Sequence, residues 1–80
     1  MIEGIMMALS ETSRGERVRI IEIAGDDAVS IRLMEMGLTP GVEMVLVGAA
    51  PLGDPLEFEV RGYRLSLRRN EAARVSIARV

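Results

Sequence analysis

The side chains that most often carry enzyme chemistry are missing from this sequence. It contains no His, no Cys and no Lys, and its ten basic residues are all Arg. Its serines therefore have no imidazole or amine to act as a general base, and the usual ligands of transition-metal sites are absent. The sequence predicts no catalytic residue, no cofactor-binding residue and no metal-ligand set, and an enzyme is not expected.

Carboxylates and arginines are the reactive groups that remain. Asp26 and Asp27 stand directly before a helical pattern, where a carboxylate caps the first amides far more often than it binds a cation. A weak carboxylate metal site stays open. A phosphate loop of the GxxxxGK[ST] type is excluded, because such a loop needs a Lys.

Charge is distributed unevenly along the chain. Residues 1–60 hold four Arg and eleven acids, a net −7, whereas residues 61–80 hold six Arg and one acid, a net +5; together they give the overall −2. Such asymmetry is typical of an interaction face. An arginine-rich codon usage explains the absence of Lys equally well.

Within the basic half, Arg61, Arg64 and Arg68 stand on the polar side of one predicted strand and its turn. A guanidinium group suits two-pronged contacts with a carboxylate or a phosphate. We therefore take these three residues as candidate partner-binding residues. The alternative is a solvated face on which they pair with Glu57 and Glu59.

The element that positions these arginines is a predicted β-hairpin at 56–60 and 63–69. Apolar and polar residues alternate in both segments, which is typical of half-buried strands. If Arg61-Gly62 is the turn, Glu59 faces Arg64 as a cross-strand ion pair. Either a primed two-residue turn or a bulged longer loop would use the positive φ that Gly62 allows. The apolar positions then face each other as Leu56 with Leu67, Phe58 with Leu65 and Val60 with Tyr63, all predicted to point into the core.

The remaining elements flank this hairpin. Val18 and Ile20 alternate out of phase with Ile21 and Ile23, which indicates a bulge or a strand covered on both sides. Asn70 is expected to cap the helical turn before the final strand. Residues 1–6 are expected to be a frayed extension of a single domain at 7–80. The predicted elements are a strand at 17–24, a helix at 27–36 ended by Gly37, a strand at 42–47, a helical turn at 71–73 and a strand at 75–78.

These elements predict a mainly β fold. We expect a small barrel of about five strands, with one short α-helix between the first two strands and a helical turn before the last.

The predicted helix is apolar on two sides. Val29, Leu33 and Met36 form one stripe, which we assign to the core, while Ile31 and Met34 lie well away from it. The second side is either a further contact surface or the cover of a neighbouring loop. We include Ile31 and Met34 among the candidate partner-binding residues.

The loop before the hairpin is the third candidate surface. Its two prolines, Pro51 and Pro55, stiffen it, and Leu52 is free to act as an apolar tip. Leu52, Gly53 and Asp54 are thus candidate contact residues. The alternative for this loop is a rigid connector.

Several short sequence blocks form a pattern that is specific in combination, although no single block would be. The blocks are Leu9-Ser10-Glu11, Gly15, Arg32-Leu33-Met34-Glu35-Met36-Gly37-Leu38, Pro40-Gly41, Ala50-Pro51-Leu52-Gly53-Asp54-Pro55, Val60-Arg61-Gly62-Tyr63-Arg64-Leu65-Ser66-Leu67-Arg68 and Glu71-Ala72. In this pattern the chain resembles, over roughly residues 7 to 80, the FeoA family, the small cytosolic component of bacterial ferrous-iron uptake. The resemblance implies an SH3-like barrel, transition metal ion binding, and a protein partner, the membrane transporter FeoB with its cytosolic GTP-binding domain.

We therefore expect a non-enzymatic, cytoplasmic accessory of ferrous iron uptake that acts by protein–protein contact. No apolar run approaches the roughly 18 residues of a membrane span, and the oligomeric state, including a weak homo-oligomer, is left open. Two alternatives remain. One is a nucleic-acid-binding small barrel, which the basic half favours but the acidic pI near 5.1 and the few aromatic residues oppose. The other is a stand-alone relative of the SH3-like domain of iron-dependent repressors.

Overall fold

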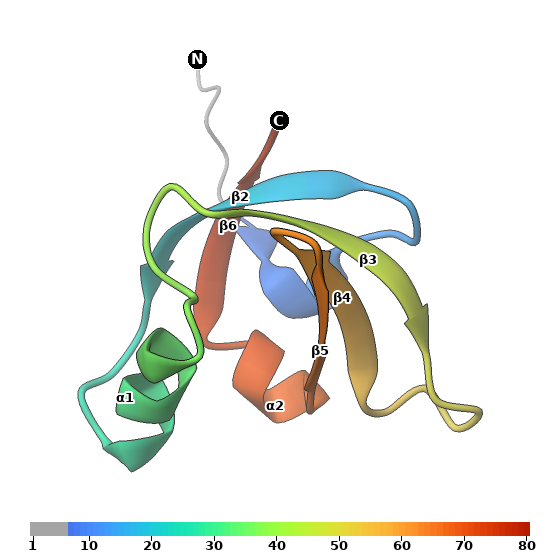
Figure 1. Cartoon of the computed structure of the whole chain (residues 1–80). Helices are drawn as coiled ribbons and strands as arrows, with labels where there is room; N and C mark the ends of the chain where they lie inside the picture. The colour runs from blue at the N-terminus through green and yellow to red at the C-terminus, as the bar shows by residue number, and fades with distance from the viewer. Residues whose placement is uncertain (1–6) are drawn as a thin grey trace.

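Six strands of the described chain form one antiparallel sheet in the order β1-β6-β2-β3-β4-β5 (Figure 1). The computed structural model describes residues 7–80, so the predicted extension at 1–6 lies outside the described residues. The mainly β fold is confirmed. The elements are β1 (Met7–Ala8), a 3-10 helix (Leu9–Glu11), β2 (Arg17–Ile23), α1 (Ala28–Glu35), β3 (Glu43–Ala49), β4 (Leu56–Val60), β5 (Tyr63–Leu67), α2 (Arg69–Ala72) and β6 (Val75–Arg79).

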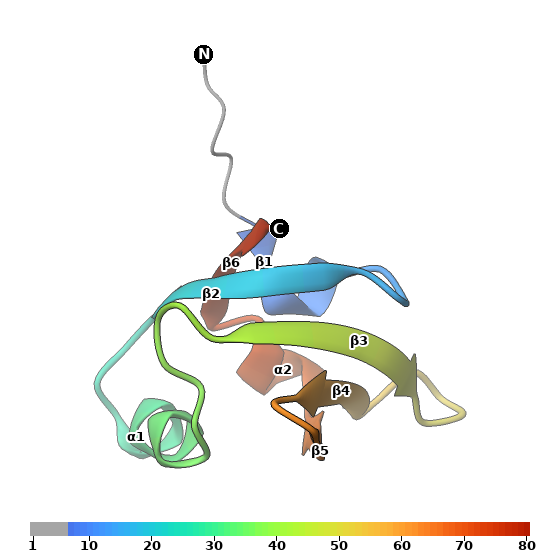
Figure 2. The same cartoon turned by 45° about the horizontal axis from the view of Figure 1, so that its top comes forward.

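Two bulges bend the sheet. The pairing of β2 with β6 shifts register between Ile20 and Glu22, so the bulge is the one of the two alternatives for this strand that forms. The pairing of β3 with β4 shifts between Leu46 and Gly48. A bulge adds a residue to one strand and increases local twist. The bent sheet curves over α2, and α1 lies to one side of the sheet in both views (Figures 1 and 2).

The arched sheet encloses a core of aliphatic side chains around one aromatic ring. Phe58 has the largest side chain among the fully buried residues. The inward positions predicted for 42–47, 56–60 and 75–78 are all buried. The core residues are Leu9, Val18, Ile20, Leu33, Leu38, Val42, Met44, Leu46, Leu56, Phe58, Val60, Leu67, Ala72, Val75 and Ile77.

The hairpin of β4 and β5 has the predicted register throughout, from Leu56 opposite Leu67 to Val60 opposite Tyr63. Its turn residues both have positive φ, 50° at Arg61 and 87° at Gly62. Two positive values identify a type I′ turn, whose twist matches that of the adjoining strands. Of the two turns that the sequence allowed, the primed two-residue turn is the one that forms.

Helix α1 starts and stops where the sequence indicates. The Asp27 side chain caps it by accepting a hydrogen bond of 3.2 Å from the Ser30 amide, and Gly37 follows its end with a φ of 98°. Leu33 is fully buried, with Val29 and Met36 half-buried against the core. Ile31 and Met34 remain exposed.

Three details of the predicted hairpin and helical turn are wrong. Tyr63 lies on the apolar side of β5 but is 42% exposed, because it sits at the end of the strand and turns its hydroxyl toward α1. Among residues 7–80, Glu59 and Arg64 face each other without an ion pair. Helix α2 begins at Arg69, before Asn70, because the Glu71 carboxylate accepts a hydrogen bond of 3.0 Å from the Arg68 amide and closes the first turn there.

The hairpin turn is tested by replacing Gly62 with Ala. An added Cβ would meet no heavy atom within 4 Å, so the cost is the left-handed backbone itself, and Gly62→Ala should lower the free energy of unfolding by about 1 kcal/mol. The matched control is Gly48→Ala. Gly48 also has open space, but its φ is not positive, so stability should stay equal or rise slightly. Equal losses in urea denaturation of both variants would contradict the turn assignment.

The helix cap predicts a pH dependence. The hydrogen bond from Arg74 and then the Ser30 amide lower the pKa of Asp27 from its ordinary value of 3.8 to about 2. Because the folded value lies below the unfolded one, the carboxylate stabilises the fold above about pH 4, and this contribution disappears as the pH falls toward 2. Asp27→Asn keeps a capping oxygen but loses the charge. We therefore expect a shallower loss of urea midpoint between pH 5 and pH 2 in this variant, with Asp26→Asn as the control.

Candidate protein-interaction site

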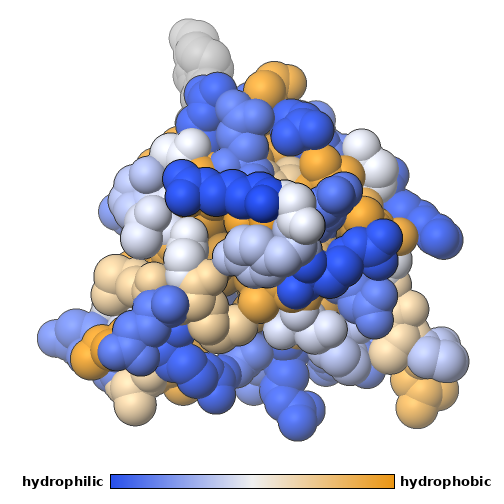
Figure 3. Space-filling view, viewed as in Figure 1, coloured by the Kyte–Doolittle hydropathy of each residue, from blue (hydrophilic) through white to orange (hydrophobic). Residues whose placement is uncertain are grey.

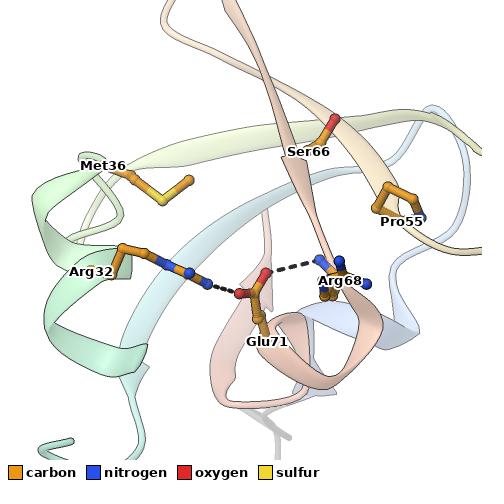
Figure 4. A pocket seen from close by; sticks show the side chains of 6 residues that line it. All are labelled: Arg32, Met36, Pro55, Ser66, Arg68 and Glu71. Atoms are coloured by element: carbon orange, nitrogen blue, oxygen red, sulfur yellow. Dashed lines mark hydrogen bonds and ion pairs between the residues drawn. The ribbon is translucent and has the colours of Figure 1, made fainter. Parts of the chain in front are cut away.

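A groove of about 440 Å³ opens between α1 and the end of the β4–β5 hairpin (Figure 4). Helix α1 contributes Arg32, whose side chain reaches toward Glu71 on α2, and Met36 lines the groove from directly after the helix. The opposite wall comes from the hairpin and from the start of α2. The residues that line the groove are Arg32, Met36, Pro55, Ser66, Arg68 and Glu71.

Two contacts hold α1 in place beside the hairpin. The Glu71 carboxylate forms an ion pair with Arg32 and also accepts the hydrogen bond from the Arg68 amide, so both of its oxygens are used. The Tyr63 hydroxyl donates a hydrogen bond of 2.9 Å to the carbonyl of Met36, at the C-terminal end of α1. Such carbonyls have no partner within their own helix, so the hydroxyl satisfies one of them. The width of the groove is therefore fixed by both contacts.

Two hydrogen bonds from Arg69 hold the loop from Pro51 to Pro55 in place. The Arg69 side chain donates a hydrogen bond of 2.6 Å from Nε to the Gly53 carbonyl, and its backbone amide donates one of 3.0 Å to the Asp54 carboxylate. Leu52 at the tip is 96% exposed. Gly53 and Asp54, both predicted as contact residues, thus shape the loop, whereas Leu52 is presented outward.

The three predicted arginines are all exposed. Across residues 7–80, none of Arg61, Arg64 and Arg68 takes part in an ion pair, although Glu57 and Glu59 are on the adjacent strand. The ion pairs of these arginines with Glu57 and Glu59 therefore do not form among the described residues. The contact role of the arginines stays a prediction.

The third predicted surface is the outer side of α1. Ile31 is 47% exposed and Met34 is 42% exposed. Apolar colour gathers over α1 and again at the loop between β3 and β4, with hydrophilic side chains between them (Figure 3). The two apolar positions lie at opposite sides of the molecule in Figures 1 and 2. The structure therefore brings Arg68 to the groove but does not bring Leu52 together with Ile31 and Met34.

Only Arg68 among the six groove residues was predicted from the sequence as a contact residue. The five that were not predicted are Arg32, Met36, Pro55, Ser66 and Glu71. Arg32 and Glu71 meet only because the fold brings α1 near α2, and nothing in their local sequence indicates this. Met36 belongs to the apolar stripe assigned to the core, and its half-buried position shows that it serves both the core and the groove. No local sequence signal indicates these contacts, because they join segments that are far apart in the chain.

The charged groups that line the groove are two guanidinium groups and one carboxylate. Within the described part of the chain, no three carboxylates, imidazoles or thiols cluster as a metal site would require. Asp27 is engaged as the helix cap and with Arg74 at 2.6 Å. No helix among residues 7–80 is long and apolar enough to cross a membrane.

Known proteins are similar to this chain in sequence. A family model of the FeoA domain matches residues 7–79. A curated Porphyromonas gingivalis protein, the Fe(2+) transport protein A/Fe(2+) transporter FeoB fusion protein, is 35% identical over 71 residues. The match covers 89% of this chain but only 8% of that fusion protein.

Solved structures extend the likeness to the fold. FeoA of Chlorobium tepidum is 39% identical with a TM-score of 0.84, covering 92% of this chain and 70% of that one. FeoA of Stenotrophomonas maltophilia, an SH3 domain protein complexed with zinc, is 33% identical with a TM-score of 0.79, covering 90% and 89%.

The IdeR structure of T. acidophilum is 17% identical with a TM-score of 0.82, covering 100% of this chain and 37% of that one, and it shows the fold alone. The fold is thus SH3-like, as the resemblance implies. The family model and the FeoA structures agree over nearly all of the described residues, and the chain belongs to the FeoA family.

Proposed function

We propose that this protein is a non-enzymatic accessory of ferrous iron uptake that acts by contact with a FeoB-type membrane transporter, on its cytoplasmic side. The observation that carries the proposal is the fusion in the Porphyromonas gingivalis relative, where a segment similar to this chain belongs to the same polypeptide as FeoB. Joining two partners in one chain keeps them close together. Ferrous iron is the cargo of the transporter in this proposal.

The side chains present support a binding role over a chemical one. The groove contains Arg32 and Glu71, but these are engaged with each other, and no nucleophile–base pair lies beside them. The zinc in the Stenotrophomonas maltophilia structure belongs to that protein. Here the absence of His and Cys leaves carboxylates as the main side-chain ligands for a ferrous ion. No three of them cluster among residues 7–80, so the proposal assigns no metal site.

The exposed candidate residues include one apolar side chain, at Leu52, and several positively charged arginines. Leu52 is presented by a fastened loop, so little conformational entropy is lost when a partner covers it. Arginines are frequent among the residues that dominate protein interfaces. A contact that combines the Leu52 tip with Arg61, Arg64 and Arg68 is the arrangement that the proposal favours.

The test is a binding titration of the full chain against the full-length FeoB-type transporter of the same organism in lipid nanodiscs. Runs with and without a non-hydrolysable GTP analogue would show whether the contact depends on nucleotide. Saturable binding is expected, and empty nanodiscs are the control. Absence of binding in both nucleotide states would reject the proposed function.

A single variant tests the loop. Leu52→Ala should weaken transporter binding by about 1 kcal/mol, roughly fivefold in Kd, because it removes an exposed apolar anchor. Its thermal stability should stay unchanged, since the side chain has few contacts to lose. Val80→Ala is the matched control, because Val80 is also exposed and lies far from this loop. Equal affinities for wild type and Leu52→Ala would remove the loop from the contact.

A further inference from the structure

Strand β5 ends the order of the sheet, so one of its sides has no neighbouring strand. The type I′ turn makes Val60 and Tyr63 a hydrogen-bonded pair, and such pairs alternate along an antiparallel ladder. Leu65 therefore also exchanges hydrogen bonds with β4. The amide and carbonyl groups of Arg64 and Ser66 point the other way, toward the free edge.

This edge is unoccupied within residues 7–80. In the described part of the chain, neither Arg64 nor Ser66 has a turn, loop or side-chain partner for its outward amide. The pairing of β5 with β4 is regular over all five residues, whereas β2 and β3 carry bulges. A regular, unpaired edge is a template on which another strand can add. The opposite edge, β1, has only two residues.

The positive charges near β5 determine which kind of strand can pair with its free edge. Five of the ten arginines form no ion pair across residues 7–80, and all but Arg14 stand on or beside β5. Glu57 and Glu59 are on β4, one strand further from the edge. The unpaired arginines near β5 are Arg61, Arg64, Arg68 and Arg69.

A second copy of this chain is a poor occupant of the edge. Antiparallel pairing of two β5 strands would bring their arginine rows next to each other, and like charges in such positions destabilise a sheet. An extended segment that carries carboxylates has the complementary charge. The charges that oppose self-association thus favour an acidic partner.

The groove lies beside the same edge. Ser66 lines it from β5, and Met36 forms an apolar wall on the α1 side (Figure 4). Arg68 lines it at the end of the strand, so an added strand meets both an apolar side chain and a free guanidinium. Alternating apolar and acidic residues match this surface, because strand side chains point alternately to the two faces.

We propose that the free edge of β5 binds an extended acidic segment of a partner protein by strand addition, through the backbone of Arg64 and Ser66. The guanidinium groups of Arg61, Arg64 and Arg68 bind carboxylates of the segment. Only the source of the segment, the FeoB-type transporter, rests on the proposed function.

The test uses the full chain labelled with nitrogen-15 and a short synthetic peptide in which valine and glutamate alternate. At a peptide concentration of about ten times Kd, amide exchange at Arg64 and Ser66 should slow about tenfold. Tyr63 and Leu65 should change little, because their amides are already bonded to β4. A peptide with lysine in place of glutamate is the control and should give no protection. Protection elsewhere without Arg64 and Ser66, or equal effects of both peptides, would overturn the proposal.

Variants separate backbone from charge. Ser66→Pro removes the outward amide, which an edge strand tolerates, and should abolish binding of the acidic peptide. Arg64→Glu should weaken binding more than tenfold, whereas Arg14→Glu, the same charge change at an unpaired arginine before β2, should change Kd less than twofold. If Ser66→Pro fails to fold, the difference in Kd between Arg64→Glu and Arg14→Glu still tests the proposal. Equal affinity of all variants would refute strand addition at this edge.

The same variants distinguish this inference from the proposed function. If the transporter in nanodiscs binds wild type, Ser66→Pro and Arg64→Glu equally, the edge is not the contact and the inference fails, while the accessory role stands. If the acidic peptide protects Arg64 and Ser66 but the transporter does not bind, the edge site stands and the proposed function fails. Dimerisation of the free chain that Ser66→Pro abolishes would identify a second copy as the occupant and overturn the acidic-segment proposal.

Discussion

The left-handed turn at Arg61 and Gly62 is the constraint on which the structure depends. It allows one register for the hairpin, and a slip of one residue would expose Phe58 and its apolar neighbours to water. A domain of this size has a small core and a small net free energy of folding, so the exposure of these side chains would remove much of its stability. The same register decides that Arg64 and Ser66 turn their backbone groups outward. One turn therefore determines both which side chains are buried and which backbone groups face the free edge of the sheet.

Helix α2 joins the parts of the candidate site. Four residues are too few to form a stable helix by themselves. Glu71 connects it to α1 through Arg32, while Arg69 connects it to the loop that carries Leu52. These tertiary contacts stabilise the helix and, at the same time, fix the groove and the loop relative to each other. Helix α2 therefore holds both the groove and the Leu52 loop in position.

The elements with strong local signals could be predicted from the sequence. Period-two alternation predicted the hairpin register, and Asp27 and Gly37 marked the ends of α1. The phase change among Val18, Ile20 and Ile21 indicated either a bulge or a strand covered on both sides. Contacts between distant segments could not be predicted, because they depend on how elements pack. The exposure of Tyr63 follows from the position of α1, and the start of α2 follows from Glu71. The contact roles assigned to Leu52, Arg64 and Ile31 stay predictions, since exposure alone identifies no partner.

The pairing of β1 with β6 places the two ends of the described chain together, with Met7 opposite Ile77. Both strands stand at the end of the sheet order opposite β5 (Figure 1). A polypeptide tether attached at either end would thus leave the β5 edge and the Leu52 loop uncovered. Such a tether can raise the local concentration of a partner to the millimolar range. A weak contact at those surfaces would then be saturated within a fused chain, while the same contact between separate chains would depend on how much of each protein the cell makes.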